Sequence, residues 1–163
     1  MDPAEATQLD VAQLHGPIGD DGIAPADLES VRRLARTYAL GIDRRDEALV
    51  QSLFTDDAVV AGSLGMSAAS EYVPKLVAGA SRYAVTMHNI TNQYVTNVAD
   101  DSGDLIVHSY AVALHFGSDD NGVGDAALAD LAMGVEYRDR VRRTDAGWLI
   151  SHRNTVARWS RSP

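Results

Sequence analysis

The sequence predicts an α+β roll, in which helices near the N-terminus pack against a long, strongly curved antiparallel or mixed sheet. Two observations support this fold class. Apolar residues recur at helical spacing up to about Ser81, whereas the chain beyond it is rich in Val, Thr, Tyr and Ile and is divided by turns of Gly and Asp. The length of 163 residues suits one domain with one core.

The first 26 residues predict an arm outside the domain, because they are polar, rich in Asp and interrupted by Gly and Pro. The domain itself is expected over residues 27–160. We predict that its first helix starts near Asp27, since Pro25 stops an earlier start and Asp27 suits an N-cap. Apolar residues at steps of three and four form one stripe on this helix: Leu28, Val31, Ala35, Tyr38 and Ile42.

Shorter elements follow the first helix. The pattern predicts a second helix over 46–54, a short strand over 58–61, a turn over 62–67 and a third helix over 68–80. Pro74 fits the third helix only if that helix starts late, because proline in a helix interior removes a backbone donor.

Four long strands are expected after the helices. They are separated by turn sequences at 100–103 and 144–147 and by a Gly- and Asp-rich loop at 118–125. Strands joined in this order form an antiparallel meander. The predicted strands span residues 83–98, 104–117, 128–144 and 148–159.

Composition excludes several classes of protein. The net charge of −9 opposes binding to a phosphate backbone, and the basic residues from Arg138 to Arg143 alternate along a strand as a solvated face would. No apolar run is long enough to cross a membrane, and the N-terminus lacks the pattern of a signal peptide. Because the chain has no cysteine, a reducing cytoplasm is the expected location. No His-x-x-x-His or His/Cys cluster predicts a metal site.

Four scattered residues combine the groups that a proton-transfer site requires. Tyr38 and Asp43 lie near the end of the first helix, His88 lies early in a predicted strand, and Arg153 lies in the last strand. An imidazole exchanges protons near neutral pH, and a carboxylate bonded to its other ring nitrogen fixes its tautomer. A phenol or guanidinium stabilises the negative charge that develops. Each residue also has a structural alternative, as a turn, core or surface-pair residue.

Five segments, taken in order, resemble the nuclear transport factor 2-like superfamily and its SnoaL-like branch. The resemblance covers about residues 28–158 and implies a cone-shaped α+β roll around one deep pocket. The segments read YALGIDRRD from Tyr38, LFTDDA from Leu53, MHNITN from Met87, YRD from Tyr137 and GWLISHR from Gly147.

The resemblance also implies which residues act. Lyases of this superfamily, such as scytalone dehydratase, bile-acid 7α-dehydratase and lindane dehydrochlorinase, use an Asp–His pair. Their positions correspond here to Asp43 and His88, with Arg153 and Tyr38 as further matches and His108 as the counterpart of a later-strand histidine.

From these residues we expect a lyase or isomerase that uses no cofactor or metal and acts on a hydrophobic cyclic small molecule. Asn92, His108 and Tyr110 are the expected substrate-binding residues. Two alternatives remain open: a non-catalytic binding or assembly module, and the small subunit of a ring-hydroxylating dioxygenase, which shares the fold. A homodimer or higher homo-oligomer is expected, because a second copy often covers the open face of such a sheet.

Overall fold

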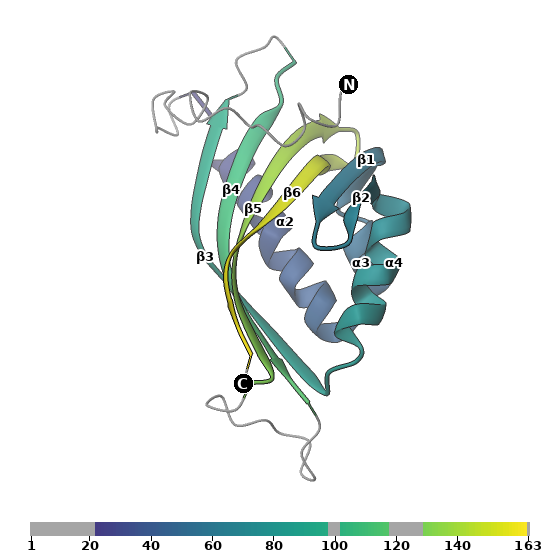
Figure 1. Ribbon diagram of the computed structural model, residues 1–163. Helices are drawn as coiled ribbons and strands as arrows, with labels where there is room; N and C mark the ends of the chain where they lie inside the picture. Colours follow the sequence, from purple (N-terminus) through teal and green to yellow (C-terminus); the bar gives the residue numbers. More distant parts are fainter. Residues whose placement is uncertain (1–21, 98–101, 118–128, 163) are drawn as a thin grey trace.

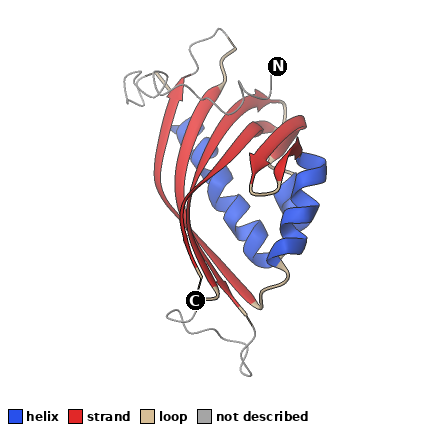
Figure 2. Ribbon diagram, viewed as in Figure 1, coloured by secondary structure: helices blue, strands red, loops and turns tan. Residues whose placement is uncertain are grey.

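The computed structural model of the protein describes residues 22–97, 102–117 and 129–162. Residues 1–21 of the predicted arm therefore lie outside the described residues, and so does the loop predicted at 118–125. Within the described ranges the structure is an α+β roll, as predicted, with helices on the concave side of one curved sheet (Figures 1 and 2). The helices are α2 (Pro25–Arg44), α3 (Glu47–Gln51) and α4 (Ala69–Ala80).

The sheet has six strands in the order β2-β1-β6-β5-β4-β3. All neighbouring strands are antiparallel except β1 and β6, which are parallel. The predicted meander of four long strands is extended beyond β6 by a short hairpin of β1 and β2. The register of β5 against β6 shifts twice, and that of β3 against β4 shifts once; such irregularities increase twist and bending. The strands are β1 (Phe54–Gly62), β2 (Gly65–Ala68), β3 (Val85–Asn97), β4 (Leu105–Phe116), β5 (Leu131–Thr144) and β6 (Gly147–Arg161).

Helix α2 starts earlier than predicted. Its N-cap is Ala24 and Pro25 is its first residue, so Asp27 is not the cap. Proline suits this place because the first helical residues have no intrahelical partner for a backbone N–H. Asp27 instead accepts a hydrogen bond from the Trp148 indole at 2.9 Å and pairs with Arg143, which ties the start of α2 to β6 and β5. The predicted apolar stripe is buried throughout.

The segment after α2 also differs from the prediction. Helix α3 is a single short turn capped by the Asp46 side chain, and β1 already begins at Phe54. Gly41 allows α3 to lie against α2, because a Cβ there would meet the Val50 side chain at 2.6 Å. The predicted turn over 62–67 contains most of strand β2, which pairs with the end of β1.

Pro74 lies inside α4, although the sequence suggested a later start for this helix. Proline removes one helical hydrogen bond and costs about 3 kcal/mol in a helix interior. Tyr72, Val73 and Val77 of the same helix are buried in the core, and this packing offsets the local cost. No helix in the described ranges is long and apolar enough to cross a membrane.

The convex face of the sheet carries the basic strand residues, and carboxylates neutralise them. The prediction of a simple solvated face was therefore wrong for this stretch. Arg138 bonds Glu136 at 3.0 Å, and Arg140 bonds Asp104 at 2.6 Å. Both acids are buried, so these pairs belong to the folded structure rather than to a fluctuating surface.

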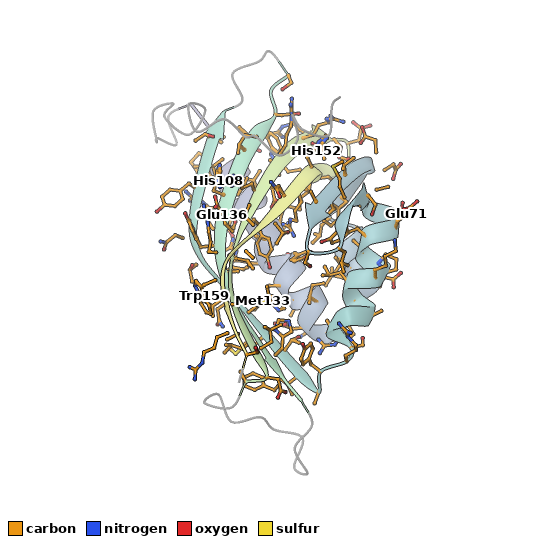
Figure 3. The ribbon with its side chains drawn as sticks, in the orientation of Figure 1. Glu71, His108, Met133, Glu136, His152 and Trp159 are labelled. Atoms are coloured by element: carbon orange, nitrogen blue, oxygen red, sulfur yellow. The ribbon has the colours of Figure 1, made fainter. Side chains whose placement is uncertain are left out.

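Glu136 is the centre of the largest such cluster. His108 lies 3.0 Å from its carboxylate through Nδ1, and Arg158 bonds the other oxygen. In Figure 3, His108 and Glu136 lie close together along the sheet. Burial alone raises the pKa of Glu136, but the hydrogen bonds from Arg138, His108 and Arg158 outweigh burial and lower the pKa to about 2.

Replacing Glu136 with glutamine should therefore change how stability depends on pH. A carboxyl group with a lowered folded-state pKa stabilises the fold above its unfolded-state pKa, and this contribution is lost as pH falls through the folded value. Over the range from 4.5 to about 2, the contribution amounts to about 3 kcal/mol. Urea unfolding at several pH values should show that Glu136→Gln is less stable at pH 7 and loses less stability on acidification. Glu71→Gln, at an exposed position, is the control. Equal acid sensitivity of Glu136→Gln and the original chain would contradict this account.

Candidate functional site

Asp43 and His88 meet where the end of α2 contacts the start of β3. The Nδ1 atom of His88 lies 2.7 Å from Oδ1 of Asp43, and the backbone N–H of His88 donates to Oδ2 at 3.0 Å. Thr86 donates its hydroxyl proton to Oδ1 at 2.9 Å. The side chain of His88 is only 8% exposed and that of Asp43 is 23% exposed. The two residues that the sequence proposed as a pair therefore do form one.

The position of Asp43 is costly for a carboxylate, because the negative end of the helix dipole lies at the C-terminus of α2. Arg45 supplies compensation. It has a left-handed backbone, with φ of 60°, and its guanidinium donates to the carbonyl of Ile42 and the hydroxyl of Thr86, both at 2.7 Å. Arg45 thus caps the helix and donates to the Thr86 hydroxyl oxygen. The hydroxyl proton of Thr86 then donates to Asp43. A chain of hydrogen bonds from Arg45 to His88 results.

The same contacts set the ionisation of Asp43. Burial raises the pKa of Asp43, but the hydrogen bonds from the His88 ring, the His88 backbone and Thr86 outweigh burial and lower the pKa below its ordinary value. Asp43 is therefore a carboxylate at neutral pH, so Nδ1 of His88 is the ring nitrogen that donates to it. That tautomer leaves Nε2 of His88 as a proton acceptor.

A cavity of about 210 Å³ lies between the helices and the concave face of the sheet. His88 lines it, next to Ala113, with which it pairs across β3 and β4. Met133 is a wall residue of this cavity, and Figure 3 shows it on the side of the sheet opposite Trp159. The wall is mostly apolar and aromatic, and includes Ile42, Tyr72, Leu76, Tyr83, Leu131, Val135 and Tyr137.

Tyr38 reaches this cavity and Arg153 does not. Tyr38 lines the wall together with Tyr137, and the two rings are 5.5 Å apart in an edge-on arrangement. Arg153 lies behind them, with its guanidinium 4.1 Å from the centre of the Tyr38 ring and 4.6 Å from that of Tyr137. It forms a buried pair of two hydrogen bonds with Asp139, at 2.7 and 2.6 Å. Arg153 therefore supports the two tyrosines from the core.

Both tyrosines remain protonated near neutral pH. Burial raises the pKa of Tyr38 to about 12, and the nearby charge of Arg153 offsets only part of that increase. Burial also raises the pKa of Tyr137 well above its ordinary value. The phenols of Tyr38 and Tyr137 are therefore hydrogen-bond donors rather than anions.

His115 is a candidate that the sequence analysis did not select. It lines the cavity, and its ring is 5.6 Å from that of His88 in an edge-on arrangement. Its Nδ1 is buried without a partner in the described part of the chain. Burial, and then the charge that His88 can carry, lower the pKa of His115. The sequence signal was indirect: the small residues Ser109, Ala111 and Ala113 precede it in one strand phase, which leaves room for a ligand.

The three predicted substrate-binding residues lie away from the cavity. His108 and Tyr110 belong to the opposite phase of β4 from Ala113 and His115, so they lie on the convex face. His108 is buried there against Glu136, and Tyr110 is 37% exposed. Asn92 is exposed at the irregular pairing between Ile90 and Gln93. Across the described ranges, no cluster of three or more His, Cys, Asp or Glu could hold a metal ion.

Replacing Thr86 with valine should raise the pKa of Asp43, because the variant removes a hydrogen-bond donor to the carboxylate. The loss should cost about 1–3 kcal/mol of unfolding free energy. A carbon-13 NMR titration of the Asp43 carboxyl group measures the pKa, and nitrogen-15 shifts report the His88 tautomer. Thr91→Val is the control. Thr91 is exposed further along β3, and within the described ranges its hydroxyl donates only to the Tyr110 carbonyl. An unchanged Asp43 titration would show that Thr86 does not position the pair.

Several solved structures share this fold. A provisionally named scytalone dehydratase from Novosphingobium aromaticivorans has 17% sequence identity, with 85% of this chain and 88% of that chain covered and a TM-score of 0.69. The Kfla4162 protein from Kribbella flavida has 22% identity, coverage of 83% and 93%, and a TM-score of 0.69. The hexachlorocyclohexane dehydrochlorinase LinA-type3 from Novosphingobium barchaimii has 20% identity, coverage of 86% and 94%, and a TM-score of 0.65. At these identities the likeness concerns the fold.

Among curated proteins, no sequence matches this chain. The family model described as a SnoaL-like domain matches residues 25–154, which include the whole of α2, the Asp43–His88 pair and Arg153. The match spans most of the described structure and confirms the resemblance noted from the five sequence segments. The protein belongs to the SnoaL-like domain family.

Proposed function

We propose that this protein is a cofactor-independent lyase that removes a proton from a carbon atom of a cyclic, largely apolar molecule. The observation that carries the proposal is the hydrogen-bonded Asp43–His88 pair, whose imidazole lines an apolar cavity. A positioned histidine with a carboxylate on its far nitrogen is a general base. The fold likeness to structures named as a dehydratase and a dehydrochlorinase supports the elimination chemistry.

In the proposed reaction, Nε2 of His88 takes the proton from the substrate carbon. The electrons of the broken C–H bond form a new double bond, and a hydroxide or halide leaves with the electron pair of its own bond. Asp43 stays ionised, holds the tautomer of His88 and stabilises the imidazolium that forms. An imidazolium next to the departing group can then return its proton to a leaving hydroxide.

The phenols of Tyr38 and Tyr137 supply stabilisation from another part of the cavity wall. Both are protonated, so each can donate a hydrogen bond to an enolate oxygen or to the departing group. Arg153 acts through these rings as a positioning residue, because it contacts both rings from the core. His115 is neutral at the same wall and offers one further polar contact.

The size of the cavity bears on the substrate. A dry cavity of about 150 Å³ is large enough to hold benzene. The cavity here measures about 210 Å³ and is open on one side, which suits a substrate with one or two rings. Double-bond migration would begin with the same proton abstraction, so isomerisation belongs to the same proposal. A cytoplasmic location also remains a prediction.

An exchange experiment tests the proton abstraction without knowledge of the leaving group. One- and two-ring ketones with an acidic C–H are incubated with the protein in deuterium oxide, and NMR records deuterium at the carbon. We expect catalysed exchange that falls at least about 10²-fold in His88→Ala and in Asp43→Asn, because each removes the base or its correct tautomer. Tyr38→Phe should lower the rate by a smaller factor.

The control variant is His152→Gln, which alters a half-buried histidine paired with Arg140 across β5 and β6, away from the cavity wall. Thermal unfolding of all variants distinguishes a lost base from a lost fold. Exchange that persists in His88→Ala, or ligand binding without any exchange across the ketone panel, would favour a binding or assembly module instead.

The proposal of a homo-oligomer rests on the convex face of the sheet. Met87, Tyr94 and Trp159 are 52%, 44% and 49% exposed there. Light scattering coupled to gel filtration should give at least twice the chain mass, and Trp159→Arg should reduce it, because a charge in a buried interface is costly. Leu40→Arg, at an exposed position of α2, is the control. A monomer mass for the original chain would refute this prediction.

A further inference from the structure

The charges around the cavity differ from those of the whole protein. The chain has 23 acidic residues and 14 Lys and Arg residues. Among the described residues that line the cavity, none is acidic, and Lys75 and Arg82 carry the fixed charges. Both are exposed, so they lie where the cavity opens to solvent. In a protein with a net charge of −9, an opening lined by cations is a local reversal of sign.

The two cations come from α4 and from the segment that follows it. Lys75 and Gly79 are one helical turn apart and line the cavity from α4, and Arg82 lines it two residues beyond the end of the helix. Within the described ranges, Lys75 and Arg82 have no carboxylate partner, and Arg82 donates only to the backbone oxygen of Gly79. Most arginines of the sheet, by contrast, are paired with acids.

The interior of the cavity would not accept an anion. Its wall is mostly apolar or aromatic, the fixed positive charges of its described residues lie at the opening, and the carboxylate of Asp43 bonds Nδ1 of His88. Transfer of an unpaired anion into such a site is strongly unfavourable. An anionic group on a bound molecule would therefore remain at the opening, where solvent and the two cations stabilise it, while its ring enters the cavity.

We propose that the substrate is amphipathic: its ring lies in the cavity and a carboxylate, sulfonate or phosphate group lies at the opening against Lys75 and Arg82. This inference rests on the proposed function where it treats the bound molecule as a substrate, but the anion site itself does not depend on catalysis. The cations would orient the ring so that its reacting face meets His88, and they would attract anions in a manner that salt weakens.

A pair of ligands that differ only in charge tests the site. 2-Naphthoate and 2-naphthamide have the same shape and two rings, and calorimetry gives the dissociation constant of each. We expect 2-naphthoate to bind about tenfold more tightly at low salt, because two partly solvated ion pairs contribute modestly. The ratio should approach one in the double variant Lys75→Gln/Arg82→Gln, and it should shrink in about 0.5 M salt.

Two further variants locate the effect. Arg33→Gln removes one exposed positive charge from α2, outside the cavity wall, and should leave the ratio unchanged. Met133→Trp fills the wall and should weaken both ligands if they bind in this cavity. Equal affinity for the two ligands, an effect of Arg33→Gln as large as that of the double variant, or no binding of either ligand would overturn the inference.

Failure of the proposed function has a different signature. His88→Ala should retain the preference for 2-naphthoate, since His88 is not part of the anion site. A preference for 2-naphthoate without any catalysed exchange would support the anion site and refute the lyase proposal. Catalysed exchange without any charge preference would do the reverse.

Discussion

The carboxylate of Asp43 links helix α2 to strand β3 of the sheet. It lies at the end of α2, where the helix dipole disfavours a negative charge, and it accepts three hydrogen bonds from β3: two from His88 and one from Thr86. These bonds hold the helix against the strand at the edge of the sheet. They also fix the imidazole, so the contact that connects helix to sheet is the contact that orients the proposed base.

A second buried charge supports two tyrosines of the cavity wall. Arg153 and Asp139 form a pair within the core, and the guanidinium contacts the rings of Tyr38 and Tyr137. A buried ion pair is weak evidence for stability, because desolvation consumes much of the attraction, but loss of one partner leaves an isolated charge. The arrangement therefore specifies where the two phenols lie. Arg153, which the family resemblance assigned to the site, therefore lies behind the cavity wall and not in it.

The sheet separates two kinds of histidine environment. On the concave side, His88 and His115 face an apolar cavity, and burial disfavours the charged form of His115. On the convex side, His108 lies in a cluster in which two arginines share the single carboxylate of Glu136. A residue of the same type thus lines a cavity on one face and belongs to a cluster of charged groups on the other. The curvature of the sheet and the helices beneath it create that difference.

The local sequence pattern alone determined three features: the order of helices before strands, the buried apolar stripe on α2 and the meander of long strands. Together with the family resemblance, it also selected Asp43 and His88 as a pair. These features depend on periodicity and on short sequence motifs. Only the tertiary structure decided which phase of β4 faces the helices, so His115 replaced His108 as the cavity residue. It also decided that Asp139 would hold Arg153 in the core. Side chains alternate along any strand, but the inward phase depends on register with distant strands and on packing against α2 and α4. That information is not contained in any one segment of the chain.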